Sequence, residues 1–317
     1  MENNTTLTAG IDTAKNKLDV AIHGQSTRLS VENAPAGYRH LAAILRKAGV
    51  NRIGIEASGG YERAVVRYLR ADDFVVQVLQ PLQVKAYARL RLRRAKNDSI
   101  DAALIAACTA AVDPPTVAAD PTLEPLANQL TFVEQLEEDL ARFSTRLEHL
   151  SDPRLRHIVV RDIARLKKRR AAELARIVAT LRRSPKLAER LDLVLSVPGI
   201  GERTALALLV RLPELGQITR EQAAALVGLA PFDDDSGLHK GQRHIAGGRD
   251  RLRRSLYAAA LPAAFHWNPA LKALYRRLTA RGKTHKVALV ACARKLLIYA
   301  NAVVQRGSAW TEASAPT

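Results

Sequence analysis

Four acidic residues occupy positions from which they could act together on a phosphate. Asp12 and Glu56 each end a short apolar stretch that is typical of a buried strand. Asp98 and Asp101 stand three residues apart in a segment that continues as helix, so both are expected on one helix face. Carboxylates that converge repel one another unless a cation lies among them, and Mg²⁺ (or Mn²⁺) is the hard ion suited to oxygen ligands. The predicted ligands and catalytic acids are Asp12, Glu56, Asp98 and Asp101.

Taken alone, the pair in the helix has a plainer interpretation as a solvated salt-bridge patch. An arginine-rich run, residues 89–94, precedes the pair. Beside a metal site, such a run would instead follow the phosphates of a nucleic acid. The predicted nucleic-acid contacts in this region are Arg89, Arg91, Arg93, Arg94 and Lys96.

Composition favours a polyanionic partner. The 317 residues include 49 Lys and Arg against 31 Asp and Glu, a formal net charge of +18. Self-repulsion of that size is relieved by a polyanion, and nucleic acid is the leading candidate. A merely basic protein and one that binds an acidic membrane surface are the alternatives. We find no signal peptide and no apolar run near membrane-span length, so we expect a cytoplasmic, nucleoid-associated protein without a membrane partner.

The elements that must position the acids form an α/β domain over residues 1–115. Three strands are expected first, over 7–12, 18–22 and 28–31, followed by alternating helices and strands that include 52–56 and 74–79. An Asp on the first strand, a Glu on the fourth and acids on a late helix is the ribonuclease-H-like arrangement with a mixed sheet. Sugar-kinase and actin-like ATPases also begin with a Gly-Ile-Asp strand, but we find none of the glycine-rich phosphate loops that they need. Cys108 and Cys292 are interpreted as small buried residues.

The middle of the chain, residues 120–187, is predicted to be a coiled-coil helical hairpin. Apolar residues from Leu123 to Leu150 recur every three or four positions, and Ser151-Asp152-Pro153 interrupts the pattern before a second helix to about Arg183. Two long helices with a tight turn fit either an arm that packs on its own chain or one that dimerises.

The remainder, residues 188–317, is predicted to be a mainly helical domain. Pro198-Gly199-Ile200-Gly201 between two helices is the helix-hairpin-helix pattern, in which backbone amides of the turn hold a DNA phosphate; a plain turn is the alternative. A loop is expected from Gly228 to Gly248. The further predicted nucleic-acid contacts are Gly199, Gly201, Lys240, Arg249, Arg253 and Arg254.

Three blocks of this sequence resemble the DEDD transposases, an insertion-sequence family that includes Piv-type site-specific DNA invertases and bridge-RNA-guided recombinases. They are Gly10-Ile11-Asp12 with Lys15, residues 56–61, and residues 96–102. Pro198-Gly199-Ile200-Gly201 and segments between Gly228 and Tyr257 resemble the C-terminal transposase domain of the family.

The resemblance implies a RuvC-like N-terminal domain that binds metal through the four acids. It also implies that Ser236 attacks a DNA phosphate as the nucleophile. Donor and target DNA, a structured guide RNA and a homo-oligomer, dimer or tetramer, are the implied partners. Two departures from the family pattern are Ser58-Gly59-Gly60 in place of the commoner Thr-Gly, and the acidic run Asp233-Asp234-Asp235 before the serine.

We therefore expect a metal-dependent transposase or recombinase. Three other functions remain as alternatives. A RuvC-type junction nuclease would use water as the nucleophile and would not need Ser236. A site-specific invertase would rejoin DNA without a guide RNA. A non-catalytic scaffold would tolerate loss of Asp12.

Overall fold

The computed structural model describes residues 7–26, 28–91, 98–113, 122–232, 235–236, 239–240 and 244–311, with backbone only at 98–100, 232, 235–236 and 239–240. The chain divides into two compact units, Met1–Ala118 and Ala119–Thr317. The predicted contacts Arg93, Arg94 and Lys96 and the acids Asp233 and Asp234 lie outside the described residues.

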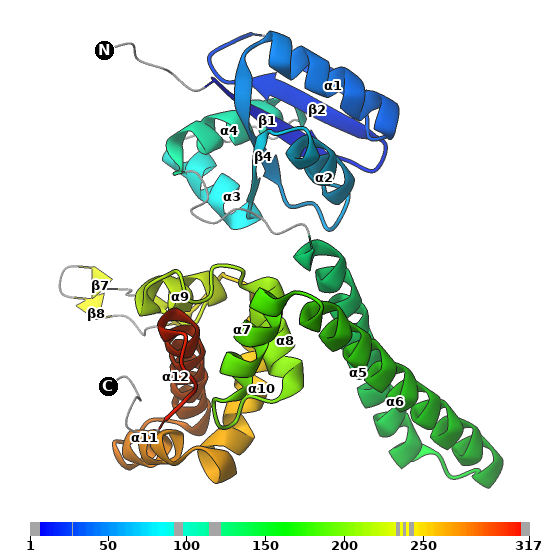
Figure 1. The fold of residues 1–317 in the computed structure, drawn as a ribbon, viewed down its shortest axis with the longest axis vertical. Coiled ribbons are helices and arrows are strands. Elements are labelled where there is room, and N and C mark those ends of the chain that lie inside the picture. The colour runs from blue at the N-terminus through cyan, green and yellow to red at the C-terminus, as the bar shows by residue number, and fades with distance from the viewer. Residues whose placement is uncertain are drawn as a thin grey trace. The chain divides into compact units, whose positions relative to one another are not determined.

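The N-terminal unit is built on a five-stranded mixed sheet, as predicted (Figure 1). The strand order is β3-β2-β1-β4-β5, with β1, β2 and β3 antiparallel and β1, β4 and β5 parallel. The strands are β1 (Leu7–Thr13), β2 (Lys17–Ile22), β3 (Arg28–Glu32), β4 (Val50–Glu56) and β5 (Val75–Leu79).

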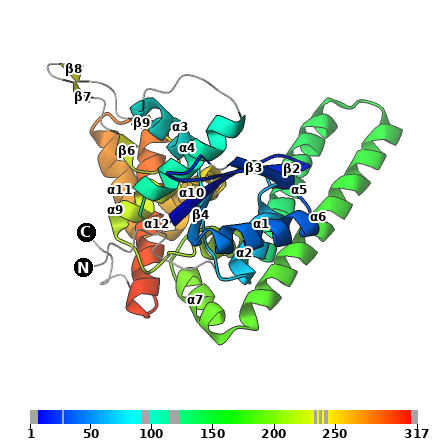
Figure 2. The same cartoon turned by 90° about the horizontal axis from the view of Figure 1, so that it is seen from above.

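Helices cover both faces of this sheet (Figures 1 and 2). On one face α1 (Pro35–Lys47) and α2 (Arg63–Ala71) bury the apolar side chains of the strands, among them Ile11, Ile53 and Ile55. On the other, α4 (Asp98–Ala111) packs on β1 and β4, and α3 (Pro81–Leu90) packs on α4.

Two glycines bring α4 directly onto the sheet. Gly10 and Gly54 are paired across β1 and β4. A Cβ atom on Gly10 would stand 2.2 Å from the amide nitrogen of Ala106, and one on Gly54 would stand 1.7 Å from Thr109 Oγ1. Real side chains do not approach so closely, so only glycine at both positions allows the helix to rest on the strands.

The C-terminal unit is helical apart from four two-residue strands in its described part. Its long hairpin is α5 and α6, and Asp152 caps α6 by accepting hydrogen bonds from the amides of Arg154 (2.8 Å) and Leu155 (3.3 Å). The helices are α5 (Leu123–His149), α6 (Pro153–Arg182), α7 (Pro185–Leu195), α8 (Glu202–Arg211), α9 (Arg220–Val227), α10 (Asp250–Pro262), the π-helix η1 (Ala263–Trp267), α11 (Pro269–Ala280) and α12 (His285–Arg306).

The apolar seam of α5 changes character along the hairpin. Near the start of the helix, Leu126, Leu130 and Val133 are buried in the main core of the unit. Toward the turn the seam is only half-buried, and Ile158 and Val160 on α6 are exposed. The two helices pack along each other, while a coiled coil and an arm that dimerises stay predictions.

One expectation about apolar runs was wrong. By length and composition α12 could cross a membrane. It packs against α7, α9, α10 and α11, and Leu289, Leu296 and Val303 are buried, which is the environment of a core helix.

Both cysteines, Cys108 and Cys292, are free and buried, as predicted.

Candidate functional site

The sheet places acidic residues side by side in one row. In the ladder of β1 and β4, Ile11 pairs with Ile55, so Asp12 and Glu56 follow next to each other at the carboxyl ends of these strands. On the other side Asp12 pairs with Asp19 of β2. Paired residues of a ladder point to the same face, so Asp19, Asp12 and Glu56 form an acidic row.

The acidic row lies on the face that carries α4. Asp12 and Glu56 follow Gly10 and Gly54 by two residues, and side chains two apart in a strand share a face. Both are half-buried. Burial raises the pKa of the Cys108 thiol on α4, and the nearby charge of Glu56 raises it further.

The direction of α4 brings its first residues to the same end of the sheet. Thr8 Oγ1 donates to the carbonyl of Ala106 (3.4 Å), whereas Gly10, further along β1, meets Ala102 as well as Ala106. The helix therefore runs opposite to β1, and Asp98 and Asp101 belong to its end nearest Asp12. Asp101 is half-buried, and the Asp98 side chain is not described.

The loop after β4 is held by a carboxylate that sequence reasoning missed. Glu62 Oε2 accepts hydrogen bonds from the amides of Ser58 (3.1 Å) and Gly60 (2.8 Å) and from the Ser58 hydroxyl (2.9 Å). Burial alone would raise the pKa of Glu62, but these bonds outweigh it and hold the pKa below its usual value. The Ser58 hydroxyl also lies 2.5 Å from Thr13 Oγ1, so the loop is tied to the residue after Asp12.

A second polar anchor fixes the same edge from the side of β3. The Asn33 side chain donates to the carbonyls of Ala14 (2.8 Å) and Tyr61 (3.1 Å), and it accepts from the Tyr38 hydroxyl (2.6 Å). The segments that follow β1 and β4 are thus cross-linked by side chains. No sequence motif marks Asn33 or Glu62, because their partners are mainly backbone groups, two of them 19 and 28 residues from Asn33.

The donors at this edge are all oxygens, which fits a hard divalent cation. Among the side chains that the structure describes, no group of three or more His, Cys, Asp or Glu stands close enough to hold a metal ion. The Asp98 side chain is not in that set, so the four-ligand site stays a prediction.

Ser236 lies in a different setting, in the C-terminal unit. The predicted loop contains two short ladders: β6 (Pro231–Phe232) pairs with β9 (His244–Ile245), and β7 (Asp235–Ser236) pairs with β8 (His239–Lys240). Ser236 pairs with His239, and Lys240 with Asp235. Their side chains are not described, so their predicted roles stay open.

Two of the predicted nucleic-acid contacts in this unit are engaged within the protein. Arg249 makes a bidentate ion pair with Glu214 (2.8 and 2.6 Å), which holds the pKa of Glu214 down although burial alone would raise it. Arg253 donates to the carbonyl of Gly247 and pairs with Asp250 (2.9 Å). Arg254 pairs with Asp250 (3.1 Å) and its side chain remains 60% exposed. In the N-terminal unit, Arg89 near the end of α3 and Arg91 just after α3 are also exposed.

The predicted helix-hairpin-helix turn connects α7 to α8. Gly199 has a φ of 96° and packs against Ala263, and Asn268 Nδ2 donates to the carbonyl of Pro198 (3.0 Å). Gly201 caps α8 and is exposed, with open space where its side chain would be. Gly201 is thus the exposed residue of the turn, and phosphate binding there stays a prediction.

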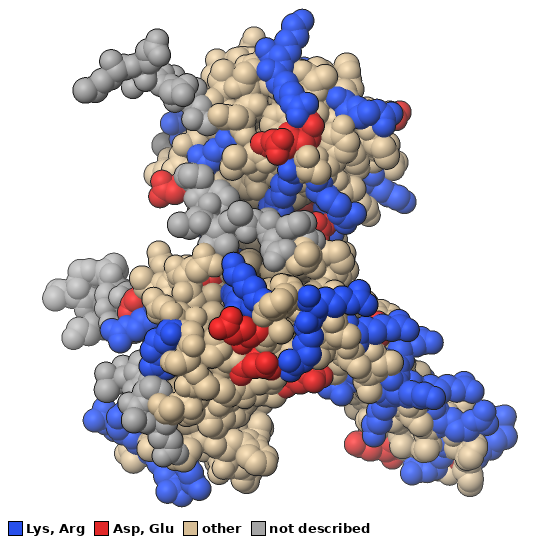
Figure 3. Space-filling view, in the orientation of Figure 1, with Lys and Arg blue, Asp and Glu red and all other residues tan. Residues whose placement is uncertain are grey.

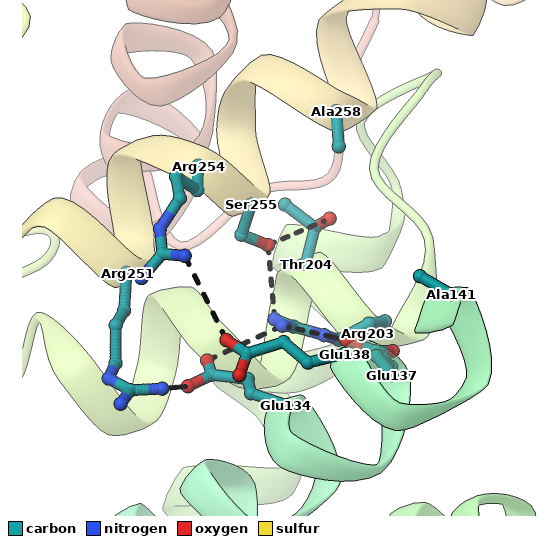
Figure 4. A pocket seen from close by; sticks show the side chains of 10 residues that line it. All are labelled: Glu134, Glu137, Glu138, Ala141, Arg203, Thr204, Arg251, Arg254, Ser255 and Ala258. Carbon is teal, nitrogen blue, oxygen red and sulfur yellow. Dashed lines mark hydrogen bonds and ion pairs between the residues drawn. The ribbon is translucent and has the colours of Figure 1, made fainter. Parts of the chain in front are cut away.

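A pocket of about 400 Å³ in the same unit is built around a buried carboxylate (Figure 4). Glu134 of α5 is ion-paired with Arg203 (3.3 Å), Arg211 (2.8 Å) and Arg251 (2.7 Å). Glu137 adds contacts to Arg203 (3.1 Å) and to Arg170 of α6 (2.9 Å). This network joins the hairpin to α8 and α10, so we interpret it as structural.

Exposed basic side chains cover much of the visible face of the hairpin (Figure 3). They come mainly from α6, which presents Arg154, Arg156, Arg161, Arg165, Lys167, Lys168 and Arg169 to solvent.

Family models match both units. A DEDD transposase model matches residues 9–152, and a model described as "Transposase IS116/IS110/IS902 family" matches residues 191–276. The first match spans the acidic row and α4, and the second spans the helix-hairpin-helix turn and Ser236.

Curated relatives agree with these models. The chain is 29% identical to the pilin gene-inverting proteins of Moraxella bovis and Moraxella lacunata, over 94% of this chain and 95% of each relative. It is 37% identical to an IS110 uncharacterized 43.6 kDa protein of Streptomyces coelicolor, over 36% of this chain and 28% of that protein.

Among solved structures, Thermus thermophilus RuvC in complex with a Holliday junction substrate aligns with 32% of this chain and 91% of its own, at 14% identity and a TM-score of 0.27. That similarity is too low to add to the fold described above. The family models and the full-length relatives are decisive, and the chain belongs to the IS110 family of transposases, enzymes that cut and rejoin DNA.

Proposed function

We propose that this protein is the transposase of an insertion sequence and that it recombines DNA by phosphoryl transfer to Ser236 with the help of a divalent metal. The observation that carries the proposal is the acidic row at the carboxyl ends of β1 and β4, with the start of α4 brought to the same end. Family membership supports the reaction class, and the net charge of +18 supports the nucleic-acid substrate.

In this proposal Asp12, Glu56, Asp98 and Asp101 hold Mg²⁺ or Mn²⁺. A bound divalent ion of this kind supplies charge stabilisation for phosphoryl transfer. The half-burial of Asp12 and Glu56 limits their motion, and the hydrogen bonds of Glu62 fix the neighbouring loop. These residues would thereby hold the ligands in place before DNA arrives.

Ser236 would form a covalent intermediate with DNA. The Ser236 hydroxyl loses its proton as the bond between its Oγ and phosphorus forms. The bond from phosphorus to a deoxyribose oxygen breaks, and that oxygen leaves with the electron pair and takes up a proton. Rejoining reverses the exchange, when a deoxyribose hydroxyl displaces the serine. The phosphoester energy is conserved, so no nucleotide cofactor is needed. Such chemistry requires the acids and Ser236 to act on the same phosphate, within one chain or between two copies.

A structured RNA encoded with the element and a homo-oligomer are further parts of the proposal. They rest on the family and on the surplus of basic residues. The exposed Ile158 and Val160 near the end of the hairpin would suit a contact with a second copy.

An invertase that needs no guide RNA is the second candidate. It is favoured by the match to the two pilin gene-inverting proteins, which extends over 94% of this chain. The DNA that flanks the gene separates the two: a structured non-coding segment favours RNA guidance, and inverted repeats around an invertible segment favour inversion.

The direct test uses a plasmid that carries the natural flanks of the gene, with recombinant junctions measured by sequencing. The wild type should give junctions, whereas Ser236→Ala and Asp12→Asn should give none. A Ser236→Ala protein that still cleaves without rejoining would assign the chain to the nuclease class. An Asp12→Asn protein with full recombination would exclude the metal-site proposal.

A further inference from the structure

Three aromatic rings from three consecutive elements gather at the surface of the C-terminal unit. Phe265 of η1 lies 4.9 Å from Tyr275 of α11 between ring centroids, at an interplanar angle of 56°. The ring of His285, the first residue of α12, lies 5.7 Å from Tyr275 and 6.4 Å from Phe265. The Tyr275 hydroxyl is 2.7 Å from His285 Nδ1, which locks the two rings together. We call these three residues the aromatic trio.

The trio is open to solvent in a protein that has few aromatic residues. Aromatics make up only 4% of the chain. Phe265 is 38% exposed, His285 is exposed, and Tyr275 is half-buried against the core. Exposed apolar rings cost free energy, and Phe265 and His285 are not part of the core to which the neighbouring Ala263, Ala264 and Leu271 belong. Phe265 and His285 therefore offer ring surface to a ligand in solvent.

The backbone under the trio is unusual. Phe265 lies in a π-helix that continues α10 after Pro262, and the Asn268 amide donates to the carbonyl of Ala263 (2.9 Å) to close the wider turn. π-turns inside helices are rare and occur frequently at functional sites. The wider turn changes the angular position of Phe265 relative to a regular continuation of α10.

The elements that carry the trio, η1, α11 and α12, contain basic residues and no acidic ones. From Arg251 to Thr311 the sequence has 12 Lys and Arg and no Asp or Glu. Lys272 precedes Tyr275 by three residues and so neighbours it on α11, while Lys283 and Lys286 flank His285. All three lysines are exposed. In Figure 3, basic side chains are seen over the corner of the unit where Figure 1 labels α11.

We propose that the aromatic trio is a stacking site for an unpaired base of a nucleic acid, with the surrounding lysines holding its phosphates. Single-stranded nucleic acid is bound by this combination, in which rings accept the base face and cations follow the backbone. Duplex fits poorly, because its bases are already stacked. The inference rests on the proposed function only for the class of substrate; the unpaired strand could be RNA or DNA opened during recombination.

The test uses short single-stranded DNA and RNA of one sequence with 2-aminopurine at one position, and the matching duplex as competitor. On binding to the wild type we expect quenching of the 2-aminopurine fluorescence. The variant Phe265→Ala/His285→Ala should lose this quenching and about tenfold or more in affinity for the single strand, since stacking on a ring stabilises each bound base substantially. Its affinity for duplex should stay within about twofold, because phosphate contacts to lysines remain.

Two matched variants control for packing and for charge. Val287→Ala removes an exposed aliphatic side chain (51% exposed) two residues after His285 and should bind as the wild type. Phe265→Tyr keeps a ring and should retain quenching. The DNA and RNA arms identify the strand: loss for RNA alone assigns an RNA site, loss for DNA alone an opened DNA strand, and loss for both a site shared by the two.

Wild-type binding without quenching, or equal loss of single-strand and duplex binding in the double variant, would overturn the stacking site. Should the double variant unfold, photocrosslinking of the wild type to a 5-iodouracil oligonucleotide decides. Adducts on Phe265, Tyr275 or His285 support the site, and adducts confined to other residues overturn it. Neither assay requires Ser236 or a divalent ion, so a failed stacking site and a failed catalytic proposal give different results.

Discussion

The carboxylates that gather in each of the two units have opposite surroundings. In the C-terminal unit, Glu134 is surrounded by the guanidinium groups of Arg203, Arg211 and Arg251, and its charge is neutralised within the protein. In the N-terminal unit, the strand register sets Asp12 between Asp19 and Glu56, so acid neighbours acid. The first arrangement stabilises a junction between helices. The second brings like charges close together, and a bound cation would reduce their repulsion.

Because of this difference, substitutions in the two clusters should affect different properties: stability in the arginine network and recombination in the acidic row. Removing the buried Glu134 from the arginine network takes this counter-charge away from the half-buried Arg211 and Arg251. Removing a carboxylate from the acidic row reduces repulsion between like charges. Glu134→Gln should therefore destabilise the C-terminal unit, whereas Asp12→Asn should leave the N-terminal unit folded but inactive.

The largest effect is expected for Asp12→Asn. Recombination should fall by roughly a thousandfold or more, the size seen when a group that stabilises transition-state charge is lost. The melting temperature should stay unchanged or rise, because one negative charge of the acidic row is gone. Asp19→Asn is the matched control, since Asp19 pairs with Lys17 (2.8 Å) and is not a predicted ligand. Equal losses in both variants would show that the row acts as a whole and not through the predicted ligands.

Next in size is Glu134→Gln, which should destabilise the C-terminal unit by about 3–5 kcal/mol, the usual cost of breaking a buried ion pair. Both tryptophans, Trp267 and Trp310, belong to this unit, so their fluorescence reports its unfolding in denaturant. Glu138→Gln should change the stability by less than about 0.5 kcal/mol, because Glu138 is 49% exposed and lies 3.9 Å from Arg254. Similar losses for the two variants would argue against the structural role of the network.

Gly10→Ala tests how the acids of α4 are positioned. The added methyl group would meet the α4 backbone, and we expect a loss of about 1–3 kcal/mol together with a loss of recombination, because α4 must move away from Asp12. Amide hydrogen exchange of β1 and α4 measures the effect. Gly201→Ala, with a φ of −85° and open space around it, should leave the stability unchanged. A stable and active Gly10→Ala protein would contradict this packing.

The smallest effect is expected for Glu62→Gln, about 1–2 kcal/mol from a weakened set of hydrogen bonds. The pKa of Glu62 is lowered in the folded protein, so its carboxylate stabilises the fold above the unfolded pKa, and that contribution is lost as the pH falls through the folded pKa. The difference between wild type and variant should be full at neutral pH and should narrow in acid. A difference that is the same at all pH values would mean that the Glu62 charge is not involved.

Much of the fold could be predicted because the signals are local. Gly10-Ile11-Asp12 and Gly54-Ile55-Glu56 read as short buried strands, and the structure pairs them in register. The order of strands and helices predicted the mixed sheet, and the apolar pattern after Leu123 predicted the long helices of the hairpin.

The residues that hold the site together could not be predicted, because they bind mainly backbone groups, which no sequence pattern marks. Asn33 and Glu62 have no motif of their own, yet they tie down the segments beside Asp12 and Glu56. The sequence also could not show that Glu214 and Asp250 pair with Arg249 and Arg253, two of the predicted nucleic-acid contacts. The length of the apolar stretch in α12 was underestimated as well. The helix is long and apolar enough to cross a membrane, and more than half of this stretch is buried within the protein.

The most direct measurement is to trap the protein on DNA. Wild-type protein is mixed with Mg²⁺ and a DNA from the gene's own flank that carries a nick beside the cleavage position, and the denatured products are digested and analysed by mass spectrometry. We predict a nucleotide linked to the peptide that contains Ser236, absent in Ser236→Ala, in Asp12→Asn and without the divalent ion. Cleavage by Ser236→Ala at the wild-type rate, with no covalent adduct in the wild type, would contradict the account.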